Sequence, residues 1–402
     1  MSIELGGIAL SQTTDVIVIG GGLVGCAAAY YLSKKNTAVT LVEKGQLNRQ
    51  ASGQNAGSLH FQLEFRMVHF WKELEQEMGE LIPMSVESEK VWRALEDELD
   101  ADLEVIQDGG FMVAETEEEL ALLKKKYELE KKWHLNTELL TGDEARKIAP
   151  YLSRNIVGAA FCPDEGHANP RHVTLTYAQR AAEKGAQILT ESNVTNIMQH
   201  RNEWVVEING ETIIRAHHVI LAAGAWVSDL AKMVGIHVPM FPVPLTMNVT
   251  EQTTPFIEHM VQHVGKRITL KQVRDGNVLI GGGWSSKFLK TNGMLDFNLS
   301  PLINPEAIQG NCKIARDLVP DVGHLRIIRS WPGVTGITDD QLPLLGEFPD
   351  RKGLWIAGGG SGFTFGPLYG SILADLITVG MTDFKINAFL PNKLSHLNLF
   401  ME

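Results

Sequence analysis

The sequence predicts a mixed α/β fold in which a parallel-sheet domain is interwoven with an antiparallel-sheet domain. Residues 15–43 read as a strand, a glycine turn, a helix and a second strand that ends in an acid. Strand-like segments, some joined as hairpins, fill the chain between about residues 204 and 283. A buried strand at 353–357 then leads through a second glycine-rich loop into an apolar helix. Because an α/β pattern returns after antiparallel strands, we expect the parallel-sheet domain to be discontinuous in sequence.

Each part of the N-terminal unit has a physical role. Gly20, Gly22 and Gly25 occupy the first, third and sixth places of a G-x-G-x-x-G turn. They allow a tight bend, the close approach of a pyrophosphate, and close packing of helix on strand. The helix N-terminus attracts phosphates, and Glu43, about twenty residues on, is placed to accept ribose hydroxyls. A lone G-x-G-x-x-G also occurs in unrelated turns, but the complete unit favours a dinucleotide site.

Bulk composition limits the class of protein. The 402 residues are 44% hydrophobic and 21% charged, which is typical of a globular protein of two or three domains. No apolar run reaches about eighteen residues, so we expect no transmembrane helix, and residues 1–14 do not resemble a secretory signal. The formal charge of −12 argues against nucleic acid as a main partner. Cys26, Cys162 and Cys312 are far apart, so we expect no metal site and a cytoplasmic location.

The other elements are predicted from periodicity and turn signals. Residues 50–58 are expected to form a small-residue loop, and 115–133 a charged helix with a solvated face. Two further helices are expected, at 61–80 and 173–184. The expected strands are 187–189, 204–208, 212–214, 219–221, 267–272 and 277–281. Those at 204–208 and 212–214 are expected to form one hairpin, and those at 267–272 and 277–281 another.

Four separated stretches together resemble one family. They are the turn at 20–25, the loop at 51–57, the strand that runs into 222–224, and the glycine loop at 358–366. Together they resemble the FAD-dependent D-amino-acid oxidase superfamily over essentially the whole chain. The resemblance implies a Rossmann-like FAD-binding domain of the glutathione-reductase/D-amino-acid-oxidase type, interwoven with an antiparallel-sheet substrate domain. The implied FAD-binding domain comprises 1–85, 150–228 and 325–402, and the substrate-binding domain comprises 86–149 and 229–324.

Two other stretches, 268–284 and 329–346, resemble the β subunits of heteromeric bacterial dehydrogenases for opines, proline and D-hydroxyproline. This resemblance implies oxidation of the C–N bond of an amino acid or N-substituted amino acid by hydride transfer to flavin N5, followed by hydrolysis of the imine. Electrons would pass to a partner subunit with further redox centres, which could hold the protein at the inner membrane. The alternatives are a stand-alone oxidase that uses O2, a non-catalytic flavin-binding subunit, and an NAD-dependent dehydrogenase with the same first turn.

The family resemblance also assigns cofactor roles to matching positions. The implied FAD-binding residues are Gly20, Gly22, Gly25, Glu43, Lys44, Ser52, Asn55, Ala56, Gly57, Val194, Gly224, Trp226, Gly360, Gly362, Thr364 and Gly366. The C-terminal loop has an independent physical reason for its role. Reduction places negative charge on the N1–C2=O region of a flavin, and a glycine loop before a helix offers N–H donors there. The alternative is a flexible strand–helix turn.

The substrate side departs from the family pattern. Relatives often carry an arginine soon after a W-x-G motif, where its guanidinium suits a planar carboxylate, but here Thr335 stands at that place. Either the substrate is larger and held differently, or another cation binds its carboxylate. The candidate cations are Arg49, Arg66, Lys271 and Arg329.

The predicted substrate-pocket residues are His60, Lys271, Trp331 and Thr335. Lys271 resembles the flavin-facing lysine of monomeric sarcosine oxidase, and the alternative is a solvent-facing strand lysine. His60 either faces the flavin or is a buried core histidine, and Trp284 and Trp331 form either pocket walls or plain core. His172 resembles the FMN-attachment histidine of heteromeric sarcosine oxidase β subunits, which would place FMN at a subunit interface; the alternative is an ordinary residue of a first helical turn.

Overall fold

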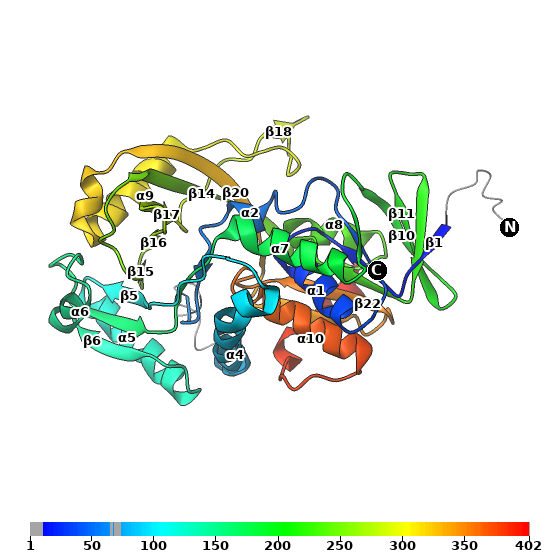
Figure 1. Ribbon diagram of the computed structural model, residues 1–402, viewed down its shortest axis with the longest axis horizontal. Coiled ribbons are helices and arrows are strands. Elements are labelled where there is room, and N and C mark those ends of the chain that lie inside the picture. Colours follow the sequence, from blue (N-terminus) through cyan, green and yellow to red (C-terminus); the bar gives the residue numbers. More distant parts are fainter. Residues whose placement is uncertain (1–10, 65–66, 68–73, 402) are drawn as a thin grey trace.

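The computed structural model describes residues 11–64, 67 and 74–401, and its central element is a six-stranded sheet (Figure 1). The strand order is β21 (Pro343–Glu347), β22 (Leu354–Gly359), β13 (His218–Leu221), β2 (Val16–Ile19), β3 (Val39–Val42) and β9 (Gln187–Leu189). All neighbours are parallel except β21, which pairs antiparallel with β22. Since a parallel sheet is covered on both faces, its strands are continuously apolar, and β2 and β3 are buried throughout.

Helices cover one face of this sheet and a smaller sheet covers the other. The alternation of side chains along β2 puts Val16 and Val18 in the helical core and Ile17 and Ile19 in the opposite core. The helical layer contains α1 (Leu23–Lys34), α7 (Pro170–Glu183) and α10 (Gly366–Thr378). The smaller sheet has the order β1 (Ser11–Thr13), β12 (Thr212–Ala216), β11 (Glu203–Ile208) and β10 (Val194–His200).

An eight-stranded sheet forms the other half of the molecule. Its order is β20 (Ile327–Thr338), β14 (Met240–Gln252), β17 (Asn277–Gly281), β16 (Thr269–Gln272), β15 (Met260–His263), β5 (Gly110–Ala114), β7 (Gly158–Cys162) and β6 (Glu138–Thr141). Neighbours are antiparallel except β15 and β5. Residues of α5 (Glu117–Lys132) join the helical core, which continues into this half, and those of α6 (Gly142–Ile148) and α9 (Pro305–Leu318) join a separate core.

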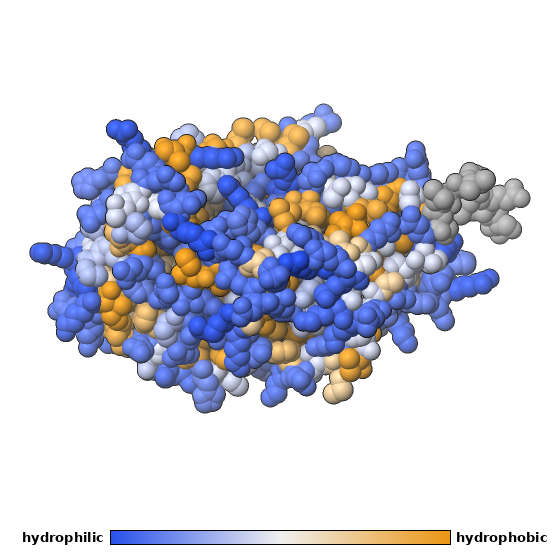
Figure 2. Space-filling view, viewed as in Figure 1, coloured by the Kyte–Doolittle hydropathy of each residue, from blue (hydrophilic) through white to orange (hydrophobic). Residues whose placement is uncertain are grey.

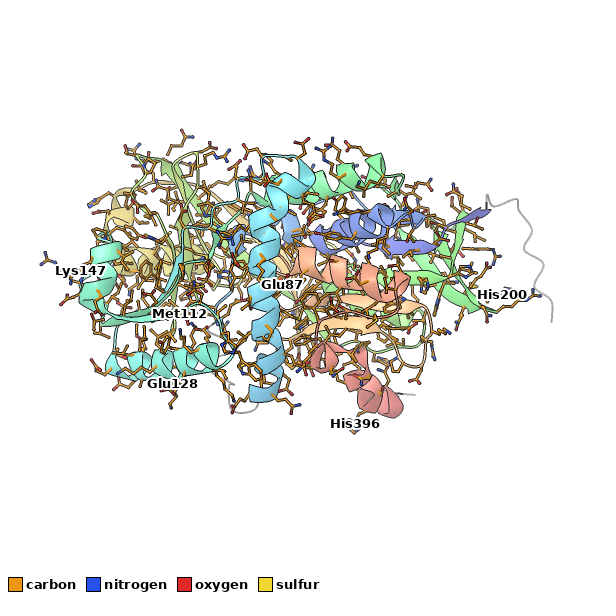
Figure 3. The ribbon with its side chains drawn as sticks, turned by 60° about the horizontal axis from the view of Figure 1, so that its bottom comes forward. Glu87, Met112, Glu128, Lys147, His200 and His396 are labelled. Atoms are coloured by element: carbon orange, nitrogen blue, oxygen red, sulfur yellow. The ribbon has the colours of Figure 1, made fainter. Side chains whose placement is uncertain are left out.

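Helix α4 (Glu75–Leu99) stands between the two halves, as Figure 3 shows at the labelled Glu87. Trp92 Nε1 and Ser88 Oγ on this helix donate to the carbonyl oxygen of Thr364, at 2.6 and 2.7 Å. These bonds fix the glycine loop before α10 to α4. Among the described residues no helix is long and apolar enough to cross a membrane.

A short hairpin, β18 (Lys290–Thr291) and β19 (Met294–Leu295), projects at the edge of the molecule (Figure 1). Apolar side chains gather at that edge in Figure 2. Met294 and Leu295 are 73% and 50% exposed. The hairpin therefore places apolar surface where a soluble monomer would ordinarily place polar side chains.

The predicted fold class is confirmed, and most predicted elements form with small changes at their ends. Three expectations are wrong in part. Residues 61–64 are not helical, and residues 65, 66 and 68–73 of the helix predicted at 61–80 lie outside the described residues. The loop predicted at 50–58 contains the short helix α2 (Ala51–Gln54). Helix α5 has the expected solvated face, but two of its charged side chains, Lys126 and Glu130, are buried instead. The domain boundaries stay a prediction.

Candidate active site

A cavity of about 1280 Å³ is lined by the carboxyl ends of the central parallel strands and by one face of the eight-stranded sheet. Ligands of open α/β sheets bind at the carboxyl ends of the strands. The volume exceeds the roughly 300–1,000 Å³ that is usual for one small ligand. The cavity can therefore hold a dinucleotide together with a second small molecule.

The glycine turn brings backbone to the cavity wall. A Cβ on Gly25 would lie 2.0 Å from the carbonyl oxygen of Gly20, so no side chain fits between α1 and the turn. Gly22 is the N-cap of α1 and supplies no capping side chain, while Ser52 Oγ accepts the N–H of Leu23 at 2.9 Å. Because Gly22, Leu23 and Ser52 line the cavity, the N-terminus of α1 presents its partial positive charge there.

Glu43 is held at the end of β3, beside the glycine turn. Its Oε2 accepts the N–H of Gly21 at 2.7 Å, and its Oε1 accepts the N–H of Gly45 at 2.9 Å. An ionised carboxylate has about four acceptor positions, so two further hydroxyl donors can still bind. The next residue, Lys44, lies over the ring of Trp226, with Nζ 4.2 Å from the centroid, and burial lowers the pKa of Lys44.

The C-terminal glycine loop forms another part of the wall. Gly359 and Gly360 have φ of +73° and +55°, which glycine adopts most readily. Thr364 is buried, and its Oγ1 accepts the N–H of His60 at 3.2 Å. Since α4 holds the carbonyl of Thr364 from the other side, the end of this loop next to α10 is fixed. The role of the loop at the flavin stays a prediction.

The predicted cofactor residues gather at this cavity. All of them line it except Gly25, Gly57 and Gly366. These three glycines lie instead at close contacts between elements: a Cβ on Gly57 would lie 2.0 Å from the carbonyl oxygen of Ala168, and one on Gly366 would lie 3.0 Å from Leu23. Their individual roles stay predictions.

Two of the four predicted substrate-pocket residues line the cavity. His60 and Thr335 line the cavity, whereas Lys271 and Trp331 do not. Lys271 is 1% exposed, and its Nζ donates to Ser58 Oγ at 3.0 Å. Burial holds the pKa of Lys271 well below its usual value. The alternative of a solvent-facing lysine is therefore wrong, and the hydrogen bond to Ser58, which lines the cavity, connects Lys271 to its wall.

Trp331 is a connecting residue. Its Nε1 donates to the carbonyl oxygen of Gln54 at 2.8 Å and so joins β20 to α2. Trp284 is 39% exposed, and a Cβ on Gly310 would lie 2.3 Å from its indole, so this ring packs against α9. Neither tryptophan lines the cavity.

Among the described residues, none of the predicted carboxylate-binding cations lines the wall. Arg49 and Arg329 do not line the cavity, and Arg66 lies outside the described residues. The guanidinium of Arg329 lies 6.0 Å from the ring centroid of Trp331. His172 lies in the first turn of α7 with a side chain 51% exposed, 3.6 Å from Glu104. This position fits the ordinary reading of His172, and an attached FMN stays a prediction.

One wall of the cavity was not predicted from the sequence. Phe241, Val243, Leu245 and Met247 of β14 all line it. Alternate residues of a strand share one face, and these positions carry an apolar residue at every second place. That alternation was the available signal. The wall gives the cavity an apolar surface opposite the glycine turn and loop.

A buried polar network supports the segment that carries His60. Glu165 Oε1 accepts the N–H groups of Phe61 and Gln62, both at 3.0 Å, and Glu130 Oε1 accepts the N–H of Leu63 at 2.7 Å. Lys126 Nζ donates to Glu130 at 2.8 Å and to Gln62 at 2.7 Å. Burial raises the pKa of Glu165 to about 7. The network therefore fixes residues 61–63 without contact with solvent.

The chain matches the family described as "DAO: FAD dependent oxidoreductase" over residues 15–376. It belongs to this family. The cofactor is FAD, and the cavity fits it, since a glycine turn, an oriented carboxylate and a second glycine loop surround a volume larger than one small ligand needs. Bound FAD would be held by the backbone of residues 20–23, by Glu43 and by the loop at 358–364.

Two curated relatives resemble the chain over most of its length. Glycine oxidase of Geobacillus kaustophilus (strain HTA426) is 29% identical over 387 residues, which covers 94% of this chain and 97% of the relative. Sarcosine oxidase subunit beta of Arthrobacter sp is 27% identical over 370 residues, covering 88% and 86%.

Two solved structures have the same fold. L-proline dehydrogenase from P. horikoshii superposes with a TM-score of 0.85 at 25% identity and covers 96% of this chain and 99% of that one. Glycine oxidase from Geobacillus kaustophilus superposes with a TM-score of 0.83 at 26% identity, covering 94% and 98%.

Proposed function

We propose that this protein oxidises the C–N bond of an amino acid or N-substituted amino acid, as the catalytic β subunit of a heteromeric dehydrogenase. The observation that carries the proposal is the cavity itself, which joins the glycine-turn site to the apolar wall of β14. Relatives named for glycine, sarcosine and proline support the substrate class. The similarity to a sarcosine oxidase β subunit and the exposed Met294 and Leu295 support a partner subunit.

Bound FAD would accept a hydride from the carbon that bears the amine. The chain's own residues position the substrate for this step. Val243, Leu245 and Met247 exclude water from one side, and the fixed segment that carries His60 closes another. The substrate loses a hydride and a proton and becomes an imine. Water then adds to the imine carbon and releases a carbonyl compound and an amine.

A single-chain oxidase is the second candidate. The observation that favours it is the glycine oxidase relative, which this chain covers almost completely. The two candidates differ in the electron acceptor and in the presence of a partner subunit. A non-catalytic subunit, a cytoplasmic location at the inner membrane and an FMN at His172 also stay predictions.

Product analysis tests the proposal. Purified protein with FAD is incubated with glycine, sarcosine, proline derivatives and opines, either with an artificial electron acceptor or with oxygen alone, and the carbonyl product and released amine are quantified. Turnover with the artificial acceptor but not with oxygen supports a dehydrogenase. Turnover with oxygen alone supports the oxidase. FAD-loaded protein that forms no carbonyl product from any amine would contradict both.

A further inference from the structure

Residues 288–301 form an arm that leaves the eight-stranded sheet and returns to it at one place. Lys287 and Leu302 exchange both of their backbone hydrogen bonds, at 2.9 and 2.8 Å, so the two ends of the arm lie side by side. Just before the arm, the N–H of Ser286 donates to the carbonyl oxygen of Pro244 on β14 at 2.9 Å. The base of the arm is therefore fixed, and the arm, which carries the hairpin β18–β19, projects from it (Figure 1).

The arm has internal contacts of its own. The rings of Phe288 and Phe297 meet edge to face, with their centroids 4.9 Å apart. The N–H of Asp296 donates to the carbonyl oxygen of Leu289 at 2.9 Å, and Thr291 Oγ1 donates to the Asp296 carboxylate at 2.9 Å. These contacts join the two sides of the arm, so it keeps a defined shape beyond its base.

The far side of the arm meets the half of the molecule that carries the central parallel sheet. Lys44 Nζ donates to Oδ1 of Asn298 at 3.3 Å. Among the described residues, this is the only hydrogen bond that joins residues 288–301 to another part of the molecule. Asn298 is exposed and also lines the cavity, so it lies at the cavity rim.

This part of the rim is the cofactor end of the cavity. Lys44 directly follows Glu43, whose carboxylate accepts the N–H of Gly21 in the glycine turn at 2.7 Å. Lys44 also lies over the ring of Trp226, and both residues line the cavity. Asn298 therefore reaches across the rim to the segment beside the glycine turn, where the backbone would hold the pyrophosphate of FAD.

We propose that residues 288–301 are a lid over the cofactor end of the FAD site, and that the hydrogen bond between Asn298 and Lys44 is its latch. FAD enters and leaves when this bond breaks and the arm moves away about its base at Lys287 and Leu302. One exposed hydrogen bond contributes little net free energy, so the open lid is accessible. The latch forms with and without FAD, and it therefore sets the rates of FAD exchange more than the affinity. This inference concerns the cofactor and does not depend on the proposed C–N oxidation.

The kinetics of FAD exchange test the latch. Association is followed by the quenching of flavin fluorescence when FAD is mixed with apoprotein, and dissociation by the release of FAD from the holoprotein to an excess of a second apoflavoprotein. We expect Asn298→Ala to raise both rate constants roughly three- to tenfold and to leave their ratio nearly unchanged. Met294→Ala is the matched control, because it removes a side chain of the same arm that is 73% exposed and does not line the cavity, and it should keep both rates.

Two further variants change the lid in opposite directions. Asn298→Asp places a carboxylate against the Lys44 ammonium and should slow both rates at low ionic strength, with the effect fading as salt is added. Repulsion of the FAD phosphates by the new carboxylate would instead speed release. Because Lys287 and Leu302 are a hydrogen-bonded antiparallel pair, Asn-Gly can replace residues 288–301 as a two-residue turn. This shortened chain should exchange FAD at least as fast as Asn298→Ala.

Several results would overturn the lid. Wild-type exchange rates in Asn298→Ala would show that the bond to Lys44 does not control access. Faster release with unchanged association in that variant would make Asn298 a direct contact of FAD and not a latch. Faster release from Asn298→Asp at low salt would also count against the latch. If the shortened chain does not fold, the two exposed substitutions at Asn298 decide the matter by themselves.

Discussion

The contact between Gly25 and Gly20 makes the glycine turn sensitive to one methyl group. In Gly25→Ala the new Cβ would lie 2.0 Å from a backbone oxygen, and such atoms essentially never approach within 3.0 Å. Helix α1 and the turn must therefore separate by at least about 1 Å. Overpacking of this kind costs about 1–3 kcal/mol. If the separation displaces the helix N-terminus from the pyrophosphate, the same free energy appears as a roughly five- to 150-fold weaker affinity for FAD.

The assay is titration of the apoprotein with FAD, followed by quenching of flavin fluorescence, beside denaturant unfolding of the apoprotein. Gly79→Ala is the matched control, because its Cβ would lie 2.5 Å from the ring of Trp133 and Gly79 does not line the cavity. We expect the control to lose stability and to keep its FAD affinity. Wild-type FAD affinity in Gly25→Ala would refute the assignment of the turn to the cofactor.

Three other substitutions test the site and its support. Burial raises the pKa of Glu165 from about 4.5 in the unfolded chain to about 7 in the folded protein, so the contribution of Glu165 to stability falls by roughly 3 kcal/mol as the pH rises between those values. Denaturant unfolding of Glu165→Gln across this pH range should show no such decline. Lys126→Met leaves the buried Glu130 without its ammonium and should cost about 3–5 kcal/mol in the same assay at pH 7, part of which Glu130→Gln should restore. Ser52→Ala removes the acceptor for the N–H of Leu23 and should cost about 1 kcal/mol of stability and weaken FAD binding in the fluorescence titration.

Each of these expectations has a contradicting result. Parallel pH–stability curves for wild type and Glu165→Gln would show that Glu165 does not retain its proton. Full stability of Lys126→Met would show that the buried pair is not coupled to folding. An unchanged free energy of unfolding and FAD affinity in Ser52→Ala would show that Ser52 does not stabilise the N-terminus of α1.

The cofactor half of the site was predictable because its chemistry depends on local sequence. The spacing of Gly20, Gly22 and Gly25 and the acid at Glu43 are carried by one strand–helix–strand unit, so residues close in sequence are close in space. The C-terminal glycine loop was predicted from the family resemblance and from its place between a strand and a helix, where glycines mark a turn.

The substrate half depends on contacts between distant segments, which the sequence did not reveal. The apolar residues of β14 line the cavity because β14 lies beside β20 in the eight-stranded sheet, and no local pattern encodes that order. Lys271 is buried because β16 lies inside a sheet, although lysine is usually exposed. Likewise, the sequence pattern places Lys126 and Glu130 on a solvated helix. In the structure they are buried, and they bind residues 62 and 63.

The most direct test of C–N oxidation is an anaerobic absorbance titration of the FAD-bound protein with amino acids and N-substituted amino acids. We predict that at least one of these amines bleaches the oxidised flavin band, and that admission of an electron acceptor restores it. A bound flavin that stays oxidised with every amine, or a protein that binds no FAD even when the cofactor is added, would contradict flavin-dependent C–N oxidation by this protein.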